Sequence, residues 1–600
     1  MKVSDFSHWT ITNSKALLFF AQSLEEMLFH FGHDSIKVPA LNFHYLCMET
    51  LSCILTIDSE VIDKGNMKPL FTELSSMYAS DPVAISLYGN SFNNLFFFKD
   101  VSGEYKRDCN DIYKDASTES SIKKIQRTME FLIDDMENKN KYFNTVKKMI
   151  SEIIIKNPLE ESDLDSLYQL CRILLAELIN NDYSQEYIYK TVIEIFYSSD
   201  FPITNIEDAL NTFWNKFTFQ KNSYSVILPL RKVRFISQLK NFNNVTIERN
   251  NNKYFKNSCK WIARVDIESL DPEKARQDAV TLISFFISLL QYNSHSGKSF
   301  HGDQAIVIDI KNEITFHLKE PVTLLERAHN YSSDEINNRV YIMTNNFPVF
   351  SNKIISIIGL HSAALEAKDV NNQLLNLWTI IEILIEAERK NSYSKINQIC
   401  NILTSVLNSS YIRTLLNQLI LDLSHCVDNF SAIINSIEKG ENETEKFLAL
   451  LILNEYNTER NELLNAITKY PVLQYRIEVY RKKLSDRIEI KKLLEKHRKR
   501  LEWQIMRIYR NRNMIVHDAN HFPYINIIVQ NLHFYIDTLI DTINAYANNG
   551  YTSIDTIYSA IQKEEFAHLL LLEEKIDKNT PAPITDQFSS IVLGNSYFDL

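Results

Sequence analysis

The stretch YRNRNMIVHDAN, residues 509–520, combines two arginines, a short apolar segment and a histidine. Arg512 and Asn513 stand next to each other, His517 follows four residues after Asn513, and Arg510 offers a second cation. A histidine moves protons near neutral pH, and an arginine meets the charge that develops on a phosphate. The stretch therefore indicates phosphoryl chemistry on RNA without a metal ion, with these four residues as catalytic candidates.

The residues that lead into this stretch are basic and spaced as in a helix. From Arg476 to Ile508 the apolar residues recur at helical spacing, which predicts one long amphipathic helix or two in line. Between Arg476 and Arg512 there are 14 Lys or Arg against 5 Asp or Glu, whereas the whole chain carries −11. Such asymmetry is typical of a polyanion site, although a solvated charged face is the simpler alternative. The candidate RNA-binding residues are Lys491, Lys492, Arg498, Lys499, Arg500 and Arg507.

Helical periodicity dominates most of the remaining chain, so the predicted fold class is mainly α. Only 10 of the 600 residues are glycine, which argues against glycine-rich phosphate loops and dinucleotide-binding folds. We expect an N-terminal helical region with a sensing or regulatory role, a small α+β module, a C-terminal helical bundle with one insertion, and a last helix with a tail. The expected bounds are 1–221, 222–350, 351–548 with the insertion near 438–475, and 549–600.

The α+β module is predicted from a change of texture near Asn222. Short β-branched or aromatic runs alternate there with Asn-rich loops, which predicts strands. Asp271 and Pro272 are a typical helix start, and this helix should run to about Tyr292. The expected strands are 223–229, 233–239, 245–248 and 261–266, followed by a hairpin over 305–310 and 313–318.

Cysteine usage and hydropathy favour a cytoplasmic protein without a membrane segment. The seven cysteines contain no Cys-x-x-Cys pair, and the longest apolar run, 279–290, is too short to span a bilayer. No cofactor and no metal site are expected, because His30, His33, His44 and Cys47 lack the further spacing that four ligands need. Asp309 resembles half of a metal-dependent nuclease site, which leaves such an enzyme as an alternative.

An acidic residue within an apolar helix supports the RNA hypothesis. Glu382 lies in the apolar helix predicted over 374–386, where an unpaired carboxylate is costly. An arginine of the 509–520 stretch is its expected partner, and simple exposure to solvent is the alternative.

Taken together, the helix with Trp378 and Glu382 and the later run Arg512-Asn513-x-Ile-Val-His517 resemble the HEPN domain. Among HEPN domains the similarity is closest to the Apea-like HEPN proteins of bacterial anti-phage defence, and it extends over about 355–548. The resemblance implies an up-and-down helical bundle that dimerises and a metal-independent endoribonuclease. It also implies that arginine and histidine of two protomers meet in one cleft, and that Glu382 orients them.

The resulting prediction is an abortive-infection toxin that cleaves RNA by attack of the ribose 2′-hydroxyl. Its expected partners are RNA, with tRNA as a candidate, a second copy of the chain or more, and a phage-encoded protein as trigger. A non-catalytic scaffold that binds RNA or protein is an alternative. Arg510 and His517 share a helix face and Arg512 does not, so helical geometry favours Arg510 while the resemblance favours Arg512.

Overall fold

The computed structural model describes most of the chain, and all structural statements below concern those residues. They are 6, 8–11, 15–29, 34–58, 67–89, 119–231, 244–250, 253–255, 259–294, 300–302, 304–319, 337, 340–341, 351–367, 369–385, 392–518, 522–573 and 587–594. The predicted strand 233–239 lies outside them, as do His30, His33 and the end of the 509–520 stretch after Asp518. None of the helices described is both long and apolar enough to cross a membrane.

The chain forms two compact units that do not follow the four predicted segments. The first unit combines Asn13–Ala176 with Leu324–Leu600 and the first three residues, and the second combines Ser4–Thr12 with Glu177–Thr323. The N-terminal helices therefore belong to the same unit as the predicted HEPN region. Periodicity could not show this, because an apolar helix face does not specify which helix will cover it.

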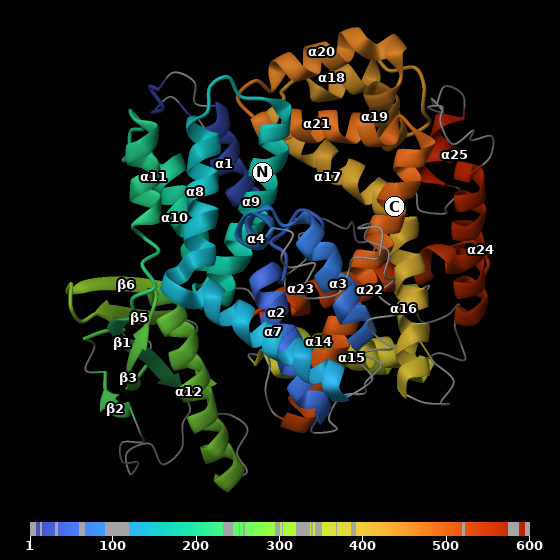
Figure 1. Cartoon of the computed structure of the whole chain (residues 1–600). Coiled ribbons are helices and arrows are strands. Elements are labelled where there is room, and N and C mark those ends of the chain that lie inside the picture. Colours follow the sequence, from blue (N-terminus) through green and yellow to red (C-terminus); the bar gives the residue numbers. More distant parts are fainter. Residues whose placement is uncertain are drawn as a thin grey trace. The chain divides into compact units, whose positions relative to one another are not determined.

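The regular secondary structure described in the first unit consists of helices (Figure 1). Its N-terminal helices are α1 (Lys15–Leu28), α2 (Phe43–Asp58), α3 (Met67–Ser80), α4 (Pro82–Tyr88), α7 (Glu119–Glu137), α8 (Lys141–Ile155) and most of α9 (Glu161–Asn180). Its C-terminal helices are α14 (Ser351–Glu366), α15 (Val370–Leu384), α16 (Ser392–Ser409), α17 (Tyr411–Cys426), α18 (Phe430–Asn435), α19 (Glu443–Ile452), α20 (Asn457–Ala466), α21 (Pro471–Leu484), α22 (Arg487–Asp518), α23 (Ile525–Asn548), α24 (Ile554–Glu573) and α25 (Phe588–Leu593). The longest, α22, packs against α16, α21, α23 and α24, and also against α3 from the N-terminal set.

The second unit contains two short helices, α10 (Gln185–Val192) and α11 (Ile206–Trp214), and a sheet covered by one long helix. The six strands are antiparallel in the order β2-β3-β1-β5-β6, with β4 paired to β1. The elements are β1 (Asn222–Arg231), β2 (Val245–Arg249), β3 (Trp261–Ser269), α12 (Pro272–Ser294), β4 (Phe300–His301), β5 (Gln304–Asp309) and β6 (Ile314–Lys319). The predicted mainly helical fold with a small α+β module is thus confirmed.

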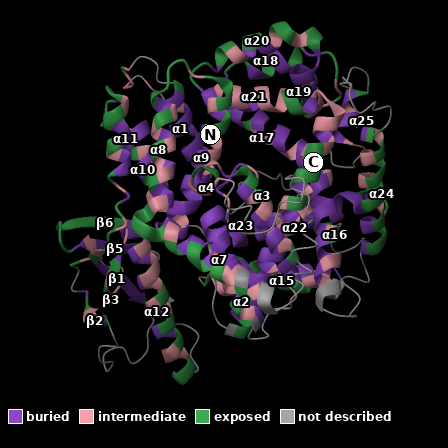
Figure 2. Cartoon of the chain, viewed as in Figure 1, coloured by how far each residue is buried: buried purple, intermediate pink, exposed green. Residues whose placement is uncertain are grey.

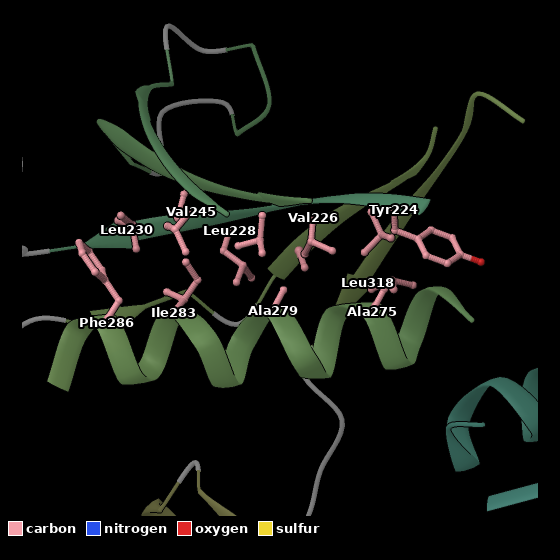
Figure 3. Packing of buried hydrophobic residues seen from close by; sticks show 14 of the residues in the cluster. Tyr224, Val226, Leu228, Leu230, Val245, Ala275, Ala279, Ile283, Phe286 and Leu318 are labelled. Atoms are coloured by element: carbon pink, nitrogen blue, oxygen red, sulfur yellow. The ribbon is translucent and has the colours of Figure 1, made fainter. Parts of the chain in front are cut away.

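Alternation along β1 explains how α12 covers the sheet. Val226, Leu228 and Leu230 point to one face, where they meet a helical stripe that includes Ala279 and Ile283 (Figure 3). Small alanine side chains let the helix approach the strands closely, so this face forms a continuous core. Toward the C-terminal end of α12, intermediate and exposed residues replace the buried ones (Figure 2).

The predicted cap of α12 is present and serves a second helix as well. Asp271 accepts a hydrogen bond from the backbone N–H of Lys274 at 2.8 Å, as an N-cap does. The same carboxylate accepts bonds from the N–H and the hydroxyl of Ser184, the N-cap of α10, at 2.8 and 2.9 Å. Burial raises the pKa of Asp271 to about 6. One carboxylate therefore joins the starts of α10 and α12.

Candidate functional site

The helix that carries the Arg–His stretch begins separately from the preceding basic helix. Asp486 accepts hydrogen bonds from the N–H groups of Ile488 and Glu489 at 2.8 and 3.2 Å, and so caps the start of α22. The basic block is therefore two helices, α21 and α22, as one of the two sequence alternatives stated. From Arg487 the helix continues unbroken to Asp518. Arg510, Arg512 and His517 thus lie on one rigid helix.

Two arginines of this helix are buried against acidic residues of the N-terminal helices. Arg510 donates to one oxygen of Glu49 on α2, from Nη2 at 2.6 Å and from Nε at 3.2 Å. Arg507 donates from Nε to the other oxygen of Glu49 at 3.0 Å, and from Nη2 to Glu73 on α3 at 2.6 Å. Arg510 is 1% exposed and Glu49 is 0% exposed. We call these four residues the buried charge cluster.

The buried charge cluster is electrically balanced, which explains why its charges can be buried. Burial by itself raises the pKa of the Glu49 carboxyl, but the positive charges of Arg507 and Arg510 outweigh it, so this pKa lies below the ordinary 4.5. Burial acts against the charge of Arg507 too, yet Glu49 and Glu73 hold its pKa well above the usual value. Two carboxylates thus neutralise two guanidinium groups away from water.

These contacts remove Arg510 and Arg507 from the predicted site. Arg510, a catalytic candidate, and Arg507, an RNA-binding candidate, are enclosed and bonded to carboxylates, so neither side chain reaches a phosphate in this structure. Helical geometry placed Arg510 on the face of His517 correctly, but at the level of Arg510 this face is buried and its guanidinium binds Glu49 of α2.

Arg512 and His517 remain accessible. Arg512 is half-buried, and its Nη1 donates to the side-chain oxygen of the buried Asn513 at 3.1 Å. Of the apolar segment, Met514 and Ile515 are buried and hold the helix end, while Val516 is 49% exposed. His517 is exposed.

No hydrogen bond or ion pair joins Arg512 to His517 in the part of the chain described. Five residues apart on a helix, the two side chains point roughly 140° away from each other. One copy of the chain therefore does not direct both groups at a single phosphate.

The expectation that Glu382 pairs with an arginine of the stretch is wrong. Its carboxylate accepts the indole N–H of Trp378 at 3.0 Å and lies 3.2 Å from Nζ of Lys395. Trp378 in turn packs on Tyr509, with ring centroids 5.7 Å apart. Among the residues described, Glu382 is linked to α22 through Trp378, and its own carboxylate faces Lys395 of α16 instead of the arginines.

Most of the other candidate RNA-binding side chains form ion pairs within the chain. Lys492 lies 2.7 Å from Glu489, Arg498 lies 2.7 Å from Glu565, and Lys491 binds Glu573. Arg500 donates to Asp34 at 3.1 Å, which again joins α22 to the N-terminal region. Lys499 is exposed and has no ion-pair partner among the residues described.

The carboxylate of Asp309, the alternative candidate for a metal-dependent site, accepts hydrogen bonds within a turn. The Asp309 carboxylate accepts the N–H groups of Lys311 and Asn312, both at 3.0 Å, and the Asn312 side-chain amide at 2.8 Å. These bonds shape the turn between β5 and β6. Within the described ranges, no metal-binding group of three His, Cys, Asp or Glu includes Asp309.

Comparison with known proteins adds no relative to this description. No family model matches the chain, and no curated protein or solved structure matches it either.

The sequence did not single out Glu49 and Glu73, the two carboxylates that bind Arg507 and Arg510 in the interior. Glu49 lies in the apolar run FHYLCMETLSCILTID, residues 43–58, a setting much like that of Glu382. The same argument about a carboxylate on an apolar helix would have singled out Glu49 as the residue in need of a buried cation.

Replacing Glu49 with Gln should destabilise the first unit by about 3–5 kcal/mol, because two buried guanidinium groups lose their shared carboxylate. Unfolding in guanidinium chloride measures the change in the free energy of unfolding, and hydrogen exchange of the α22 amides measures its local effect. Glu152→Gln is the matched control: Glu152 pairs with Lys148 on the surface, both well exposed, and its loss should leave the transition unchanged. Equal transitions for the two variants would contradict the structural importance of the buried charge cluster.

The effect of Glu49 should also depend on pH. Because its pKa is lowered in the folded state, its stabilising contribution is complete above 4.5 and is lost as the pH falls through the folded-state pKa. The difference in stability between the wild-type chain and Glu49→Gln should therefore be largest near neutral pH and shrink below about pH 4.5. A difference that grows in acid would show that the carboxylate is not ionised in the folded chain.

Proposed function

We propose that this chain is a HEPN-like, metal-independent endoribonuclease whose reacting groups are Arg512 and His517. The observation that carries the proposal is the accessibility of these two side chains on a helix whose neighbouring arginines are held in the interior. Arg507 and Arg510 fix the helix, Met514 and Ile515 anchor its end, and the side chains of Arg512 and His517 stay accessible to a substrate. Between the two catalytic arginines left open by the sequence, this accessibility favours Arg512.

The chemistry uses the nucleophile that RNA already contains. A neutral His517 accepts the proton of a ribose 2′-hydroxyl, and the 2′-oxygen then forms a bond to the adjacent phosphorus. The bond from phosphorus to the 5′-oxygen breaks, and that oxygen takes a proton from a second, protonated histidine. The guanidinium of Arg512, held by Asn513, binds the non-bridging oxygens while charge builds on them. The products are a 2′,3′-cyclic phosphate and a 5′-hydroxyl.

The second histidine comes from a second copy of the chain. Each copy contributes one exposed His517, and Arg512 points away from the histidine of its own helix. A twofold dimer that brings the two ends of α22 together supplies a base, an acid and two guanidinium groups in one cleft.

The proposed substrate class follows from the geometry of the reaction, since the ribose 2′-oxygen must be free to align with the phosphorus and the leaving 5′-oxygen. Unstacked bases in an exposed loop let the 2′-oxygen line up with the leaving group, so a structured RNA such as tRNA is the proposed target. Exposed Lys499 is placed on the same helix and offers a phosphate contact. We propose a role in anti-phage defence, with a phage-encoded protein as trigger, on the resemblance to Apea-like HEPN proteins alone.

His517→Ala should lower the rate of RNA cleavage by at least ~100-fold, because it removes the proton-transfer group. The measurement is cleavage of a labelled tRNA pool by the full-length chain, with the ends of the fragments determined chemically. His425→Ala is the control, since His425 is an exposed histidine in the last turn of α17. Cleavage by His517→Ala at the wild-type rate, or fragments with 3′-hydroxyl ends, would refute the proposed mechanism.

Mixing subunits tests whether two histidines act together. At equal amounts of wild-type and His517→Ala chains, about a quarter of randomly formed dimers contain two wild-type copies. If both histidines are needed, the mixture should retain about a quarter of the activity of an all-wild-type sample of the same total concentration. If each copy works alone, about half should remain. The mixture must be allowed to exchange subunits. Co-purification of an untagged copy with a tagged copy verifies this exchange.

A further inference from the structure

Two histidines and an aspartate from distant parts of the first unit meet on one side of α23. His533 and Asp537 are four residues apart on this helix and therefore share a face. His361, on α14, lies opposite them, with its Nε2 3.0 Å from Nε2 of His533 and 3.4 Å from Oδ1 of Asp537. The two imidazole rings are stacked, with centroids 5.0 Å apart and planes at 29°.

These separations are those of atoms that share a metal ion. Bonds of 2.0–2.1 Å at tetrahedral angles put neighbouring ligand atoms about 3.3 Å apart. The two separations of 3.0 and 3.4 Å lie close to that value, and one ligand atom from each of the three residues falls within 4.8 Å of the others.

A hydrogen-bonded arrangement does not serve Nε2 of His361 equally toward both of its neighbours. Nε2 of His361 carries either one hydrogen or one lone pair, but it faces both an imidazole nitrogen and a carboxylate oxygen. With a hydrogen, it serves one neighbour well and the other poorly. With a lone pair, it opposes the negative charge of Asp537. A divalent cation attracts all three lone pairs together and removes this conflict.

Burial of the three side chains suits an ion that enters from solvent. His533 and Asp537 are 8% and 13% exposed at their side chains, whereas His361 is 23% exposed. Two ligands are therefore shielded, and the third borders the surface. Such a set leaves one position of a tetrahedral ion for water, as in zinc sites with three protein ligands.

We infer that His361, His533 and Asp537 form a binding site for a divalent transition-metal ion, with zinc as the preferred occupant and water as the fourth ligand. Two imidazoles and one carboxylate are a set that zinc and ferrous iron both accept. The ion ties α14 to α23. This inference is independent of the proposed RNA cleavage, which uses no metal.

The test measures metal binding directly on the full-length chain. After removal of metals by a chelator, equilibrium dialysis against Zn²⁺ and elemental analysis should find about one tightly bound ion per chain. Co²⁺ in place of zinc should give visible absorption of tetrahedral intensity without a thiolate charge-transfer band, because the site contains no cysteine.

Variants assign the ion to this site. His361→Gln and Asp537→Asn should each weaken Zn²⁺ binding by at least about tenfold, since each removes a ligand. His425→Gln, at an exposed histidine outside the cluster, should bind as the wild-type chain does. His361→Gln alters the most exposed ligand and is therefore the variant expected to fold; circular dichroism checks this.

Unchanged affinity in both ligand variants, or less than about a tenth of an ion per wild-type chain, overturns the inference. RNA cleavage is assayed on the same preparations. His517→Ala should bind Zn²⁺ normally while it loses cleavage, so failure of the metal site and failure of the proposed nuclease give different results.

Discussion

The shared carboxylate of Glu49 is the contact on which the first unit depends. Its two oxygens bind two different arginines of α22, so the longest helix is oriented by a residue more than 400 positions earlier in the chain. The same principle recurs nearby: Arg500 binds Asp34, and Arg476 of α21 binds both Glu26 of α1 and Asp422 of α17. Buried charges are tolerated only where opposite charges face them, and these contacts join N-terminal and C-terminal helices within the first unit. Much of the positive charge between Arg476 and Arg512 is therefore used to hold the fold together.

Local features of the fold could be predicted because neighbouring residues determine them. The strands predicted over 223–229, 245–248 and 261–266, the capped start of α12 at Asp271 and the β5–β6 hairpin were predicted from nearby residues, and the structure confirms them. Helix ends within long apolar stretches were harder to predict from the sequence. Apolar residues recur at helical spacing throughout 412–437, but α17 ends at Cys426 and α18 begins at Phe430. The hydrophobic pattern continues across that break because both helices bury apolar faces.

The candidate site could be predicted only in part, because the contacts of its residues with distant parts of the chain cannot be read from neighbouring residues. The residue types and their spacing pointed to Arg512, Asn513 and His517; the structure leaves Arg512 and His517 accessible on different sides of one helix end and buries Asn513. Spacing could not distinguish Arg510 from Arg512, because the difference lies in which of them meets Glu49. It also could not bring His361 to His533, which are 172 residues apart. The pairing partners of polar residues are long-range properties, and a single sequence contains only weak signals for them.

The long separation between Glu49 and Arg507 has a consequence for how the chain is made. The two residues are 458 positions apart, so α2 leaves the ribosome well before its cationic partners exist. At roughly 5–20 residues per second, Glu49 waits on the order of 20–90 s for them. During translation the last residue of the second unit, Thr323, is added before the cationic partners of Glu49 exist. An unfinished chain thus lacks both the charge pairing and the ordered end of α22, and any activity of that helix end arises only once almost the whole protein has been synthesised.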